Sequence, residues 1–194
     1  GKGGVIINWN IEGSRLTKLT SAPFICALEG GDSRRENTGG KVKNITLKAK
    51  LYNCSAGLIY QTYPGAEVEN VTIKKGSVIS GDELVGGIIA LGRSFGTGSL
   101  LVTDCVVEPG VLIEAKGPSG DGTAKGVAGI MAYGGGTFTR CINGADIIAE
   151  NRSGSTHVAG ILASGNSIGM GKEGFYYCVN TGNFKITGGR TGGI

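Results

Sequence analysis

Two short motifs in this chain have the residue types and spacing of catalytic or cofactor loops. Gly92–Gly96 reads G-x-S-x-G, the turn that presents a nucleophilic serine, and Asp146 and His157 follow in the order of one serine-hydrolase triad. Gly169–Gly174 reads G-x-G-x-x-G, the loop that cradles a dinucleotide pyrophosphate. In a chain with 38 glycines, chance alone produces roughly 0.5 copies of the first pattern and 1.5 of the second. Because neither motif opens a long helix, we interpret both as loops.

Close pairs of carboxylates are a second source of chemistry, because β-helical lyases and glycosidases place acids on one outer face. Glu67 with Glu69 and Asp82 with Glu83 are such pairs. No acids recur at the equivalent positions of neighbouring units to complete a cluster. We therefore predict no catalytic residues, and a polysaccharide-processing enzyme remains an alternative.

The cysteines do not have the spacing of a metal or redox site. There are five, with no C-x-x-C pair and one histidine in the chain: Cys26, Cys54, Cys105, Cys141 and Cys178. Zinc and thioredoxin-like chemistry are unsupported, so neither a metal nor a cofactor is expected. The loop 116–126 contains the single acid Asp121, which cannot form a calcium site alone, and we interpret it as an insertion.

The charge balance does not identify a partner. Nineteen Lys and Arg residues exceed fifteen Asp and Glu by four, and the most basic stretch runs from Lys41 to Lys50. Lys48 and Lys50 alternate with apolar residues, which predicts the solvated face of a strand, with anion binding as the alternative. Basic and aromatic residues are not interleaved as in nucleic-acid sites, and no apolar stretch is long enough to insert into a membrane.

The elements that must position all of these residues are repeats. A phrase of the type Ala128-Gly129-Ile130-Met131-Ala132 recurs every 30 to 42 residues, as the distances between its glycines show. The repeat-anchor glycines of this phrase are Gly57, Gly87, Gly129, Gly160 and Gly193. We expect these glycines to satisfy positive φ or close backbone approach at corners between strands.

Two further apolar positions recur in each unit. The first is occupied by Ile45, Val71, Cys105, Cys141 and Cys178, and the second by Ile79, Ile113, Ile147 and Phe184. Turn residues such as Pro109-Gly110 and Asn143-Gly144 separate the two positions in the later copies. Stacked coils would align these residues into interior ladders, which explains the cysteines as small buried hydrophobic residues.

This pattern predicts an all-β, right-handed parallel β-helix of about five coils with three short strands in each coil. A β-propeller is the alternative repeat fold, but its blades are longer and contain four antiparallel strands. Residues 1–194 form one repeat domain, with 1–40 as an N-terminal cap or lead-in coil and 41–194 as the repeats. Since the chain begins Gly1-Lys2 without a methionine, we interpret it as a fragment of a longer protein.

The phrases Val127–Gly144 and Phe175–Asn183 resemble GLUG-motif repeats, which occur in bacterial surface adhesins and beside IgA-specific metallopeptidases. The resemblance runs from about Lys41 to the end, although Pro23 replaces the anchor glycine in the first copy and Val71 replaces the cysteine in the second interval. It implies a secreted, extracellular protein at a bacterial cell surface with no catalytic residues to transfer.

From these observations we expect a non-enzymatic adhesion or binding module whose partner is a host-surface protein or glycan. A purely structural spacer is a further alternative. Trp9, Tyr63 and Tyr133 are candidates for exposed aromatic contact. Weak end-to-end self-association is also expected, because an uncapped coil leaves an unpaired strand edge.

Overall fold

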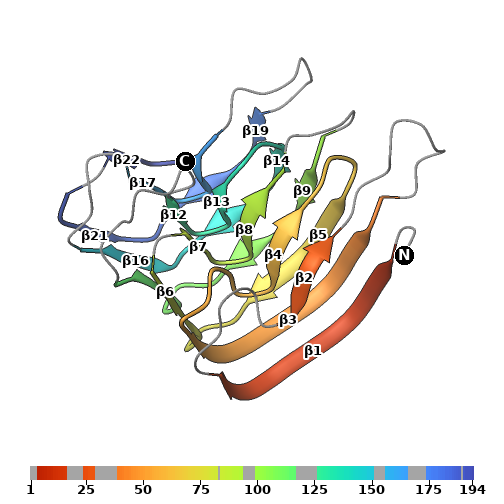
Figure 1. The fold of residues 1–194 in the computed structure, drawn as a ribbon, viewed down its shortest axis with the longest axis horizontal. Helices are drawn as coiled ribbons and strands as arrows, with labels where there is room; N and C mark the ends of the chain where they lie inside the picture. The colour runs from red at the N-terminus through yellow and green to blue at the C-terminus, as the bar shows by residue number, and fades with distance from the viewer. Residues whose placement is uncertain are drawn as a thin grey trace.

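The chain folds into a stack of parallel β-coils, seen in a computed structural model (Figure 1). Strands of successive coils form three sheets of 13, 4 and 5 strands, named here the large, the four-stranded and the five-stranded sheet. Among the residues described, no helix is long and apolar enough to cross a membrane. The structure describes residues 4–16, 24–28, 39–82, 84–93, 99–116, 126–150, 156–165, 174–188 and 190–194.

The large sheet covers two faces of each coil. Its strands are β1 (Val5–Leu16), β3 (Lys41–Tyr52), β5 (Glu67–Ile73), β6 (Val78–Gly81), β9 (Leu101–Thr103), β10 (Val106–Val107), β11 (Leu112–Ala115), β14 (Thr137–Thr139), β15 (Ile142–Asn143), β16 (Asp146–Ala149), β19 (Gly174–Tyr176), β20 (Val179–Asn180) and β21 (Phe184–Ile186). The four-stranded sheet contains β7 (Leu84–Gly86), β12 (Gly126–Ala128), β17 (His157–Ala159) and β22 (Arg190–Gly192). The five-stranded sheet contains β2 (Ile25–Leu28), β4 (Ile59–Thr62), β8 (Ile89–Gly92), β13 (Met131–Tyr133) and β18 (Leu162–Ser164).

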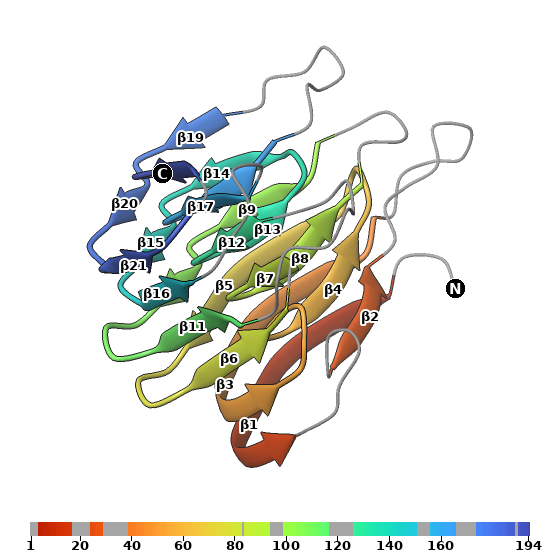
Figure 2. The ribbon, with the colours of Figure 1, turned by 60° about the vertical axis from the view of Figure 1, so that its left-hand side comes forward.

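The predicted parallel β-helix is confirmed. Every pairing between the described strands is parallel, whereas a propeller would require antiparallel blades. The solenoid makes about four turns, close to the five predicted. In Figure 2 the colours advance from β1 at one end of the stack to β19, β20, β21 and β22 at the other. A central coil contains the five short strands β9–β13, because corners divide the predicted strands further.

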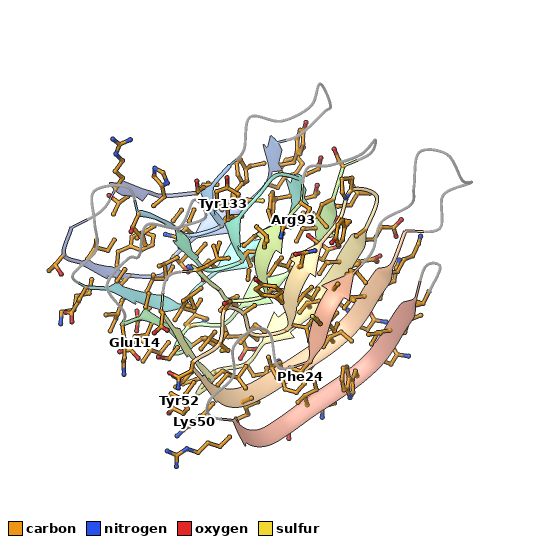
Figure 3. The ribbon with its side chains drawn as sticks, viewed as in Figure 1. Phe24, Lys50, Tyr52, Arg93, Glu114 and Tyr133 are labelled. Atoms are coloured by element: carbon orange, nitrogen blue, oxygen red, sulfur yellow. The ribbon has the colours of Figure 1, made fainter. Side chains whose placement is uncertain are left out.

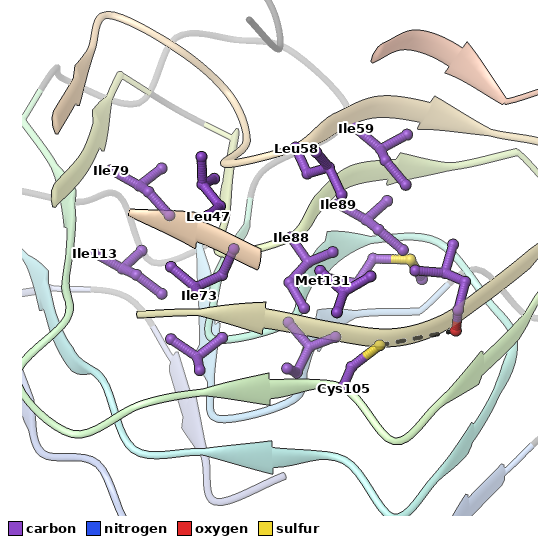
Figure 4. Close-up of a cluster of buried hydrophobic side chains, with 14 of the residues drawn as sticks. Leu47, Leu58, Ile59, Ile73, Ile79, Ile88, Ile89, Cys105, Ile113 and Met131 are labelled. Carbon is purple, nitrogen blue, oxygen red and sulfur yellow. Dashed lines mark hydrogen bonds between the residues drawn. The ribbon is translucent and has the colours of Figure 1, made fainter. Parts of the chain in front are cut away.

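One predicted row of apolar residues is aligned in register along the large sheet. Ile113 pairs with Ile79 on one side and with Ile147 on the other, and Ile147 pairs with Phe184. Leu51 extends the row to the preceding coil. The three isoleucines are fully buried, and Figure 4 shows Ile79 and Ile113 stacked beside the rest of the core. Burying each isoleucine contributes roughly 1.5–3 kcal/mol to stability.

The second row changes from aliphatic residues to cysteines along the stack. Ile45 pairs with Val71. The residues that follow the three cysteines pair in register from coil to coil, which places Cys105, Cys141 and Cys178 next in the same row. Each of these thiols donates a hydrogen bond to a carbonyl oxygen of the preceding coil, at 3.7, 3.4 and 3.4 Å respectively. The dashed line in Figure 4 marks the bond of Cys105. A thiol therefore fits this position because it fills aliphatic space and satisfies a carbonyl.

The residue before each member of this row forms a corner with left-handed backbone. The φ angles of this corner row lie between 52° and 59°, and its members are Asn8, Asn44, Asn70, Asp104, Arg140 and Tyr177. Asparagine and aspartate tolerate this conformation better than other residues with side chains. The amides also bond along the row, with Asn70 Nδ2 donating to Asn44 Oδ1 and Asn44 Nδ2 to Asn8 Oδ1, both at 2.9 Å. Corner geometry thus explains why asparagine occupies positions 44 and 70.

The repeat-anchor glycines serve close approach, and the expectation of positive φ does not apply to them. None of the five has positive φ. A Cβ added at Gly57 would lie 2.2 Å from the carbonyl oxygen of Gly87, and one at Gly87 would lie 1.9 Å from that of Gly129. At Gly160 the obstruction is the Asn180 side chain, at 2.4 Å, whereas nothing lies within 4 Å of a Cβ at Gly193. The coils therefore stack here at a spacing that excludes any side chain.

The prediction that Asn143 belongs to the turn between the two apolar positions is wrong. Asn143 lies in β15, is fully buried, and pairs in register with Val107 and Asn180. Its Nδ2 donates to Asn180 Oδ1 at 2.8 Å, and its Oδ1 accepts from the Ala145 N–H at 3.2 Å. The turn between β15 and β16 is two residues shorter than the one between β10 and β11, so the asparagine takes the place of an interior aliphatic residue.

Candidate anion-binding pocket

A hollow of the solenoid lies on the outer face of the large sheet. It has a volume of about 400 Å³ and is lined by Glu12, Gly13, Arg15, Lys48, Ala49, Lys50 and Gly76. The segment from Lys48 to Lys50 of β3 forms the floor, and β1 and the turn before β6 form the two walls. Three neighbouring coils therefore contribute to one pocket.

Two insertions in the neighbouring coils explain why the surface is hollow here. On one side β1 bulges, because Glu12 pairs with Lys48 and Ser14 with Ala49, which leaves Gly13 as an extra residue with φ of 72°. On the other side Leu47 pairs with Ile73 and Lys50 with Val78. Residues 48 and 49 of β3 thus lie opposite the four residues 74–77, which turn outward at Gly76 with φ of 86°. The flat strand between the two projections becomes the floor.

The charge of the pocket is dominated by unpaired cations. Arg15, Lys48 and Lys50 are exposed and, within the described part of the chain, have no acidic side chain at ion-pair distance. Arg15 and Lys50 are direct register partners, so two like charges lie side by side on neighbouring strands. Such a pair is destabilising on a sheet surface. Glu12 is the single acid in the lining.

Cations elsewhere on the large sheet are arranged differently. Lys41 pairs with Glu67 at 2.8 Å, and Lys74 with Glu108 at 2.8 Å. Lys43 pairs with Glu69, so two lysines of β3 each face a glutamate of β5. In the pocket the register places Lys48 beside Glu12, but it places Arg15 and Lys50 beside each other. The pocket therefore combines a cavity with a local excess of positive charge that its neighbours lack.

The position of Arg15 is fixed by an aromatic ring. Its guanidinium carbon lies 5.7 Å from the centre of the Tyr52 ring, within the range of a cation–π contact. Figure 3 shows Lys50 and Tyr52 together near the end of β3. Because a cation–π contact uses the face of the guanidinium, the N–H donors in the guanidinium plane stay available, and Arg15 can still bind an oxyanion through two parallel hydrogen bonds.

The predicted acid pairs do not form a cluster among the residues described. Glu67 and Glu69 lie on the outer face of β5, and each is neutralised by a lysine of the preceding coil. Asp82 is exposed, and Glu83 lies outside the described residues. The carboxylates of Glu67 and Glu69 are thus components of an ion-pair row on the sheet surface.

Most of each catalytic-looking motif lies outside the described residues: Ser94–Gly96 of the first and residues 169–173 of the second. Residues 117–125 of the predicted insertion also lie outside them. Asp146 is exposed and accepts a 2.9 Å hydrogen bond from Asn183 Nδ2, while His157 is half-buried on β17 of a different sheet. The hydrogen bonds of the described residues do not include one between Asp146 and His157.

The aromatic residues suggested for surface contact have different surroundings. Trp9 is 38% exposed and packs edge-to-face on Phe24 at 6.0 Å. Tyr63 accepts a hydrogen bond from Gln61 Nε2, and Arg93 Nε donates to Gln61 Oε1 at 3.1 Å. Tyr133 is half-buried against the small cluster that contains Ala90 and Leu91; Figure 3 labels Phe24, Arg93 and Tyr133. None of them lines the pocket.

The cysteines are free and differ in access. Cys26 is exposed, Cys178 is partly buried, and Cys54, Cys105 and Cys141 are buried. Burial raises the pKa of Cys54 from 9.0 to about 11 and also raises the pKa of Cys105, whereas a hydrogen bond with Cys105 lowers the pKa of Cys141. In the described residues no group of three or more His, Cys, Asp or Glu side chains could hold a metal ion.

We expect one thiol per folded chain to react quickly with Ellman's reagent at pH 8, because only Cys26 is exposed. Cys178 should follow slowly, and all five should react in guanidinium chloride. If a Cys26→Ser variant still reacted quickly with Ellman's reagent, Cys26 would not be the exposed thiol.

The buried thiol of Cys54 makes stability depend on pH. Between pH 9 and 11 the unfolded state loses the Cys54 proton while the folded state retains it, so the free energy of unfolding should fall as pH rises.

Arg15 is the pocket residue that the sequence did not reveal. The alternation of Lys48 and Lys50 is visible in the sequence, and both are exposed as predicted. Residues 1–40 carry no clear repeat phrase, however, so the pairing of β1 with β3 and the bulge at Gly13 could not be inferred. One wall did leave a signal in the sequence: two residues separate Leu47 from Lys50, whereas four separate their partners Ile73 and Val78.

Comparison of the chain with protein-family models, with curated proteins and with solved structures finds no match in any of the three.

Proposed function

We propose that this chain is a non-enzymatic binding module on a β-solenoid scaffold that contributes to adhesion at a bacterial cell surface. The observation that carries the proposal is the outer pocket, where three cations face the single acid Glu12 and, in the described structure, none of Arg15, Lys48 and Lys50 has an acidic side chain at ion-pair distance. A surface that retains like-charge repulsion at one hollow and neutralises it elsewhere is suited to a ligand that supplies the missing charge.

The rest of the scaffold directs binding to the outside. The interior rows of leucine, isoleucine, valine and cysteine are fully buried in the central coils, so they act as a packed core. Ligands of a solenoid bind to its extended outer surface and to its loops. The extracellular location and the host-surface protein or glycan partner rest on the GLUG resemblance of the repeat phrases.

A glycan and host-protein array probed with the soluble chain tests this function. We expect saturable, reproducible binding to at least one class of spotted ligand, and none by the Ile147→Asp variant, which serves as the unfolded control. Silence of the folded protein on both arrays would overturn the binding function and favour a structural spacer. Release of new reducing ends from a polysaccharide would overturn the non-enzymatic assignment.

A further inference from the structure

We propose that the outer pocket binds the carboxylate or sulfate group of an acidic polysaccharide, with Arg15 as the anchor and Lys48 and Lys50 as flanking cations. This inference rests on the proposed binding function and assigns it a site and a ligand class. It is argued from the lining of the pocket, from the pairing of strands around it and from the contact that orients Arg15.

The lining selects a hydrophilic anion. Three cations face one acid, which gives a net charge of +2 from the side chains of Arg15, Lys48, Lys50 and Glu12. The remaining lining residues are Gly13, Ala49 and Gly76, so no large apolar side chain is present to bury a hydrophobic ligand. Binding energy must therefore come from charge-assisted hydrogen bonds, for which carboxylate and sulfate oxygens are the matching acceptors.

The surroundings favour a saccharide chain over a nucleic acid. Single-stranded nucleic acids bind where exposed aromatic rings interleave with basic residues and stack on the bases. The Tyr52 ring, close to the pocket, already has Arg15 over it. A volume of about 400 Å³ lies within the range of small-molecule sites and is open at the surface. One acidic sugar unit can occupy it while the neighbouring units lie along the outer face.

The arrangement of the cations gives them different roles. Arg15 is oriented by the Tyr52 ring and can bind an oxyanion with two N–H donors. Lys50 lies directly beside Arg15 on the neighbouring strand, and Lys48 lies beside Glu12. An anion between Arg15 and Lys50 relieves their mutual repulsion, so ligand binding also stabilises the fold. Glu12 opposes the same ligand.

Titration calorimetry with sized oligosaccharides tests the proposal. The probes are a heparin-derived hexasaccharide for sulfate, an oligogalacturonate hexamer for carboxylate, maltohexaose as the neutral control, and inorganic sulfate as the free ion. We expect at least one acidic hexamer to bind and maltohexaose not to bind. Because the site is exposed and charged, affinity should fall steeply between 50 and 300 mM salt, where screening shortens from roughly 14 to 6 Å.

Four variants that each replace one charged side chain by glutamine separate a site from a general charge effect. Arg15→Gln should weaken binding by roughly tenfold or more, and Lys50→Gln by several-fold. Lys116→Gln removes an exposed cation that pairs with Glu114 outside the pocket, and it should leave affinity within about twofold. Glu12→Gln should strengthen binding, which a merely structural role for this residue does not predict.

The outcomes distinguish the site from the function. Equal losses in Arg15→Gln and Lys116→Gln, or no gain in Glu12→Gln, would overturn the pocket while leaving the binding function intact. Binding of inorganic sulfate as tight as that of the hexamers would overturn the polysaccharide as ligand. Array binding to neutral glycans or proteins only, unchanged in Arg15→Gln, would do the same. Folding does not confound these tests, because Lys50→Gln removes a like-charge contact and should not lower the melting temperature.

Discussion

Ile147→Asp should abolish the folded state or reduce its free energy of unfolding by about 4–5 kcal/mol. Ile147 is fully buried between Ile113 and Phe184, and its row contains no cation that could pair with a carboxylate. Since small domains are stable by about 5–15 kcal/mol, such a loss removes most of the available stability. Equilibrium denaturation followed by circular dichroism measures it.

Two substitutions in the same strand serve as controls. Ile147→Val keeps the row apolar and should cost only about 0.5–1.5 kcal/mol. Ile148→Asp introduces the same charge one residue later, where the side chain is partly exposed beside Lys185 of the next coil. It should cost far less than Ile147→Asp. Equal effects of the two aspartates would mean that the alternation of β16 is assigned to the wrong faces.

Gly87→Ala should cost about 3 kcal/mol or more, although it adds one methyl group. The new Cβ would lie 1.9 Å from the carbonyl oxygen and 3.0 Å from the carbonyl carbon of Gly129 in the next coil. Backbone atoms cannot rotate away as a side chain can, so the two coils must separate and weaken the pairing of β7 with β12. Urea denaturation measures the loss.

Gly193→Ala is the matched control, because Gly193 occupies the same position of the repeat phrase but has nothing within 4 Å of its added Cβ. We expect its stability to stay within about 0.5 kcal/mol of the parent protein. A mild effect at Gly87 together with an equally mild effect at Gly193 would show that stacking distance is not the reason for glycine at this position.

The repeat made the overall fold predictable, because it constrains every coil in the same way. Ile79, Ile113 and Ile147 recur at the same place after the turn of each repeat, and stacking places like on like. The left-handed corner was not predicted, since Arg140 and Tyr177 occupy it in the last coils and neither residue type signals positive φ. Asn143 was misassigned because Asn-Gly usually marks a turn, and only the shortened connection places it inside.

The pocket was less predictable than the scaffold because it arises from differences between coils. A bulge at Gly13 and two additional residues before Val78 shape it, and both belong to coils other than the one that supplies its floor. Strand pairing had to be known before the charges of Arg15 and Lys50 could be placed side by side. Sequence alternation identified the exposed lysines and could not identify their cavity.

The amide pair of buried Asn143 and half-buried Asn180 gives the stack a fixed order. Aliphatic rows are chemically uniform along the axis, so a coil displaced by one repeat would still meet an apolar neighbour. An amide displaced in the same way would face Val107 or Ile73, and its hydrogen-bonding groups would lose their partner. The two asparagines therefore disfavour arrangements in which the coils are slipped by one repeat or swapped. A single buried asparagine specifies the register of a coiled coil in the same way.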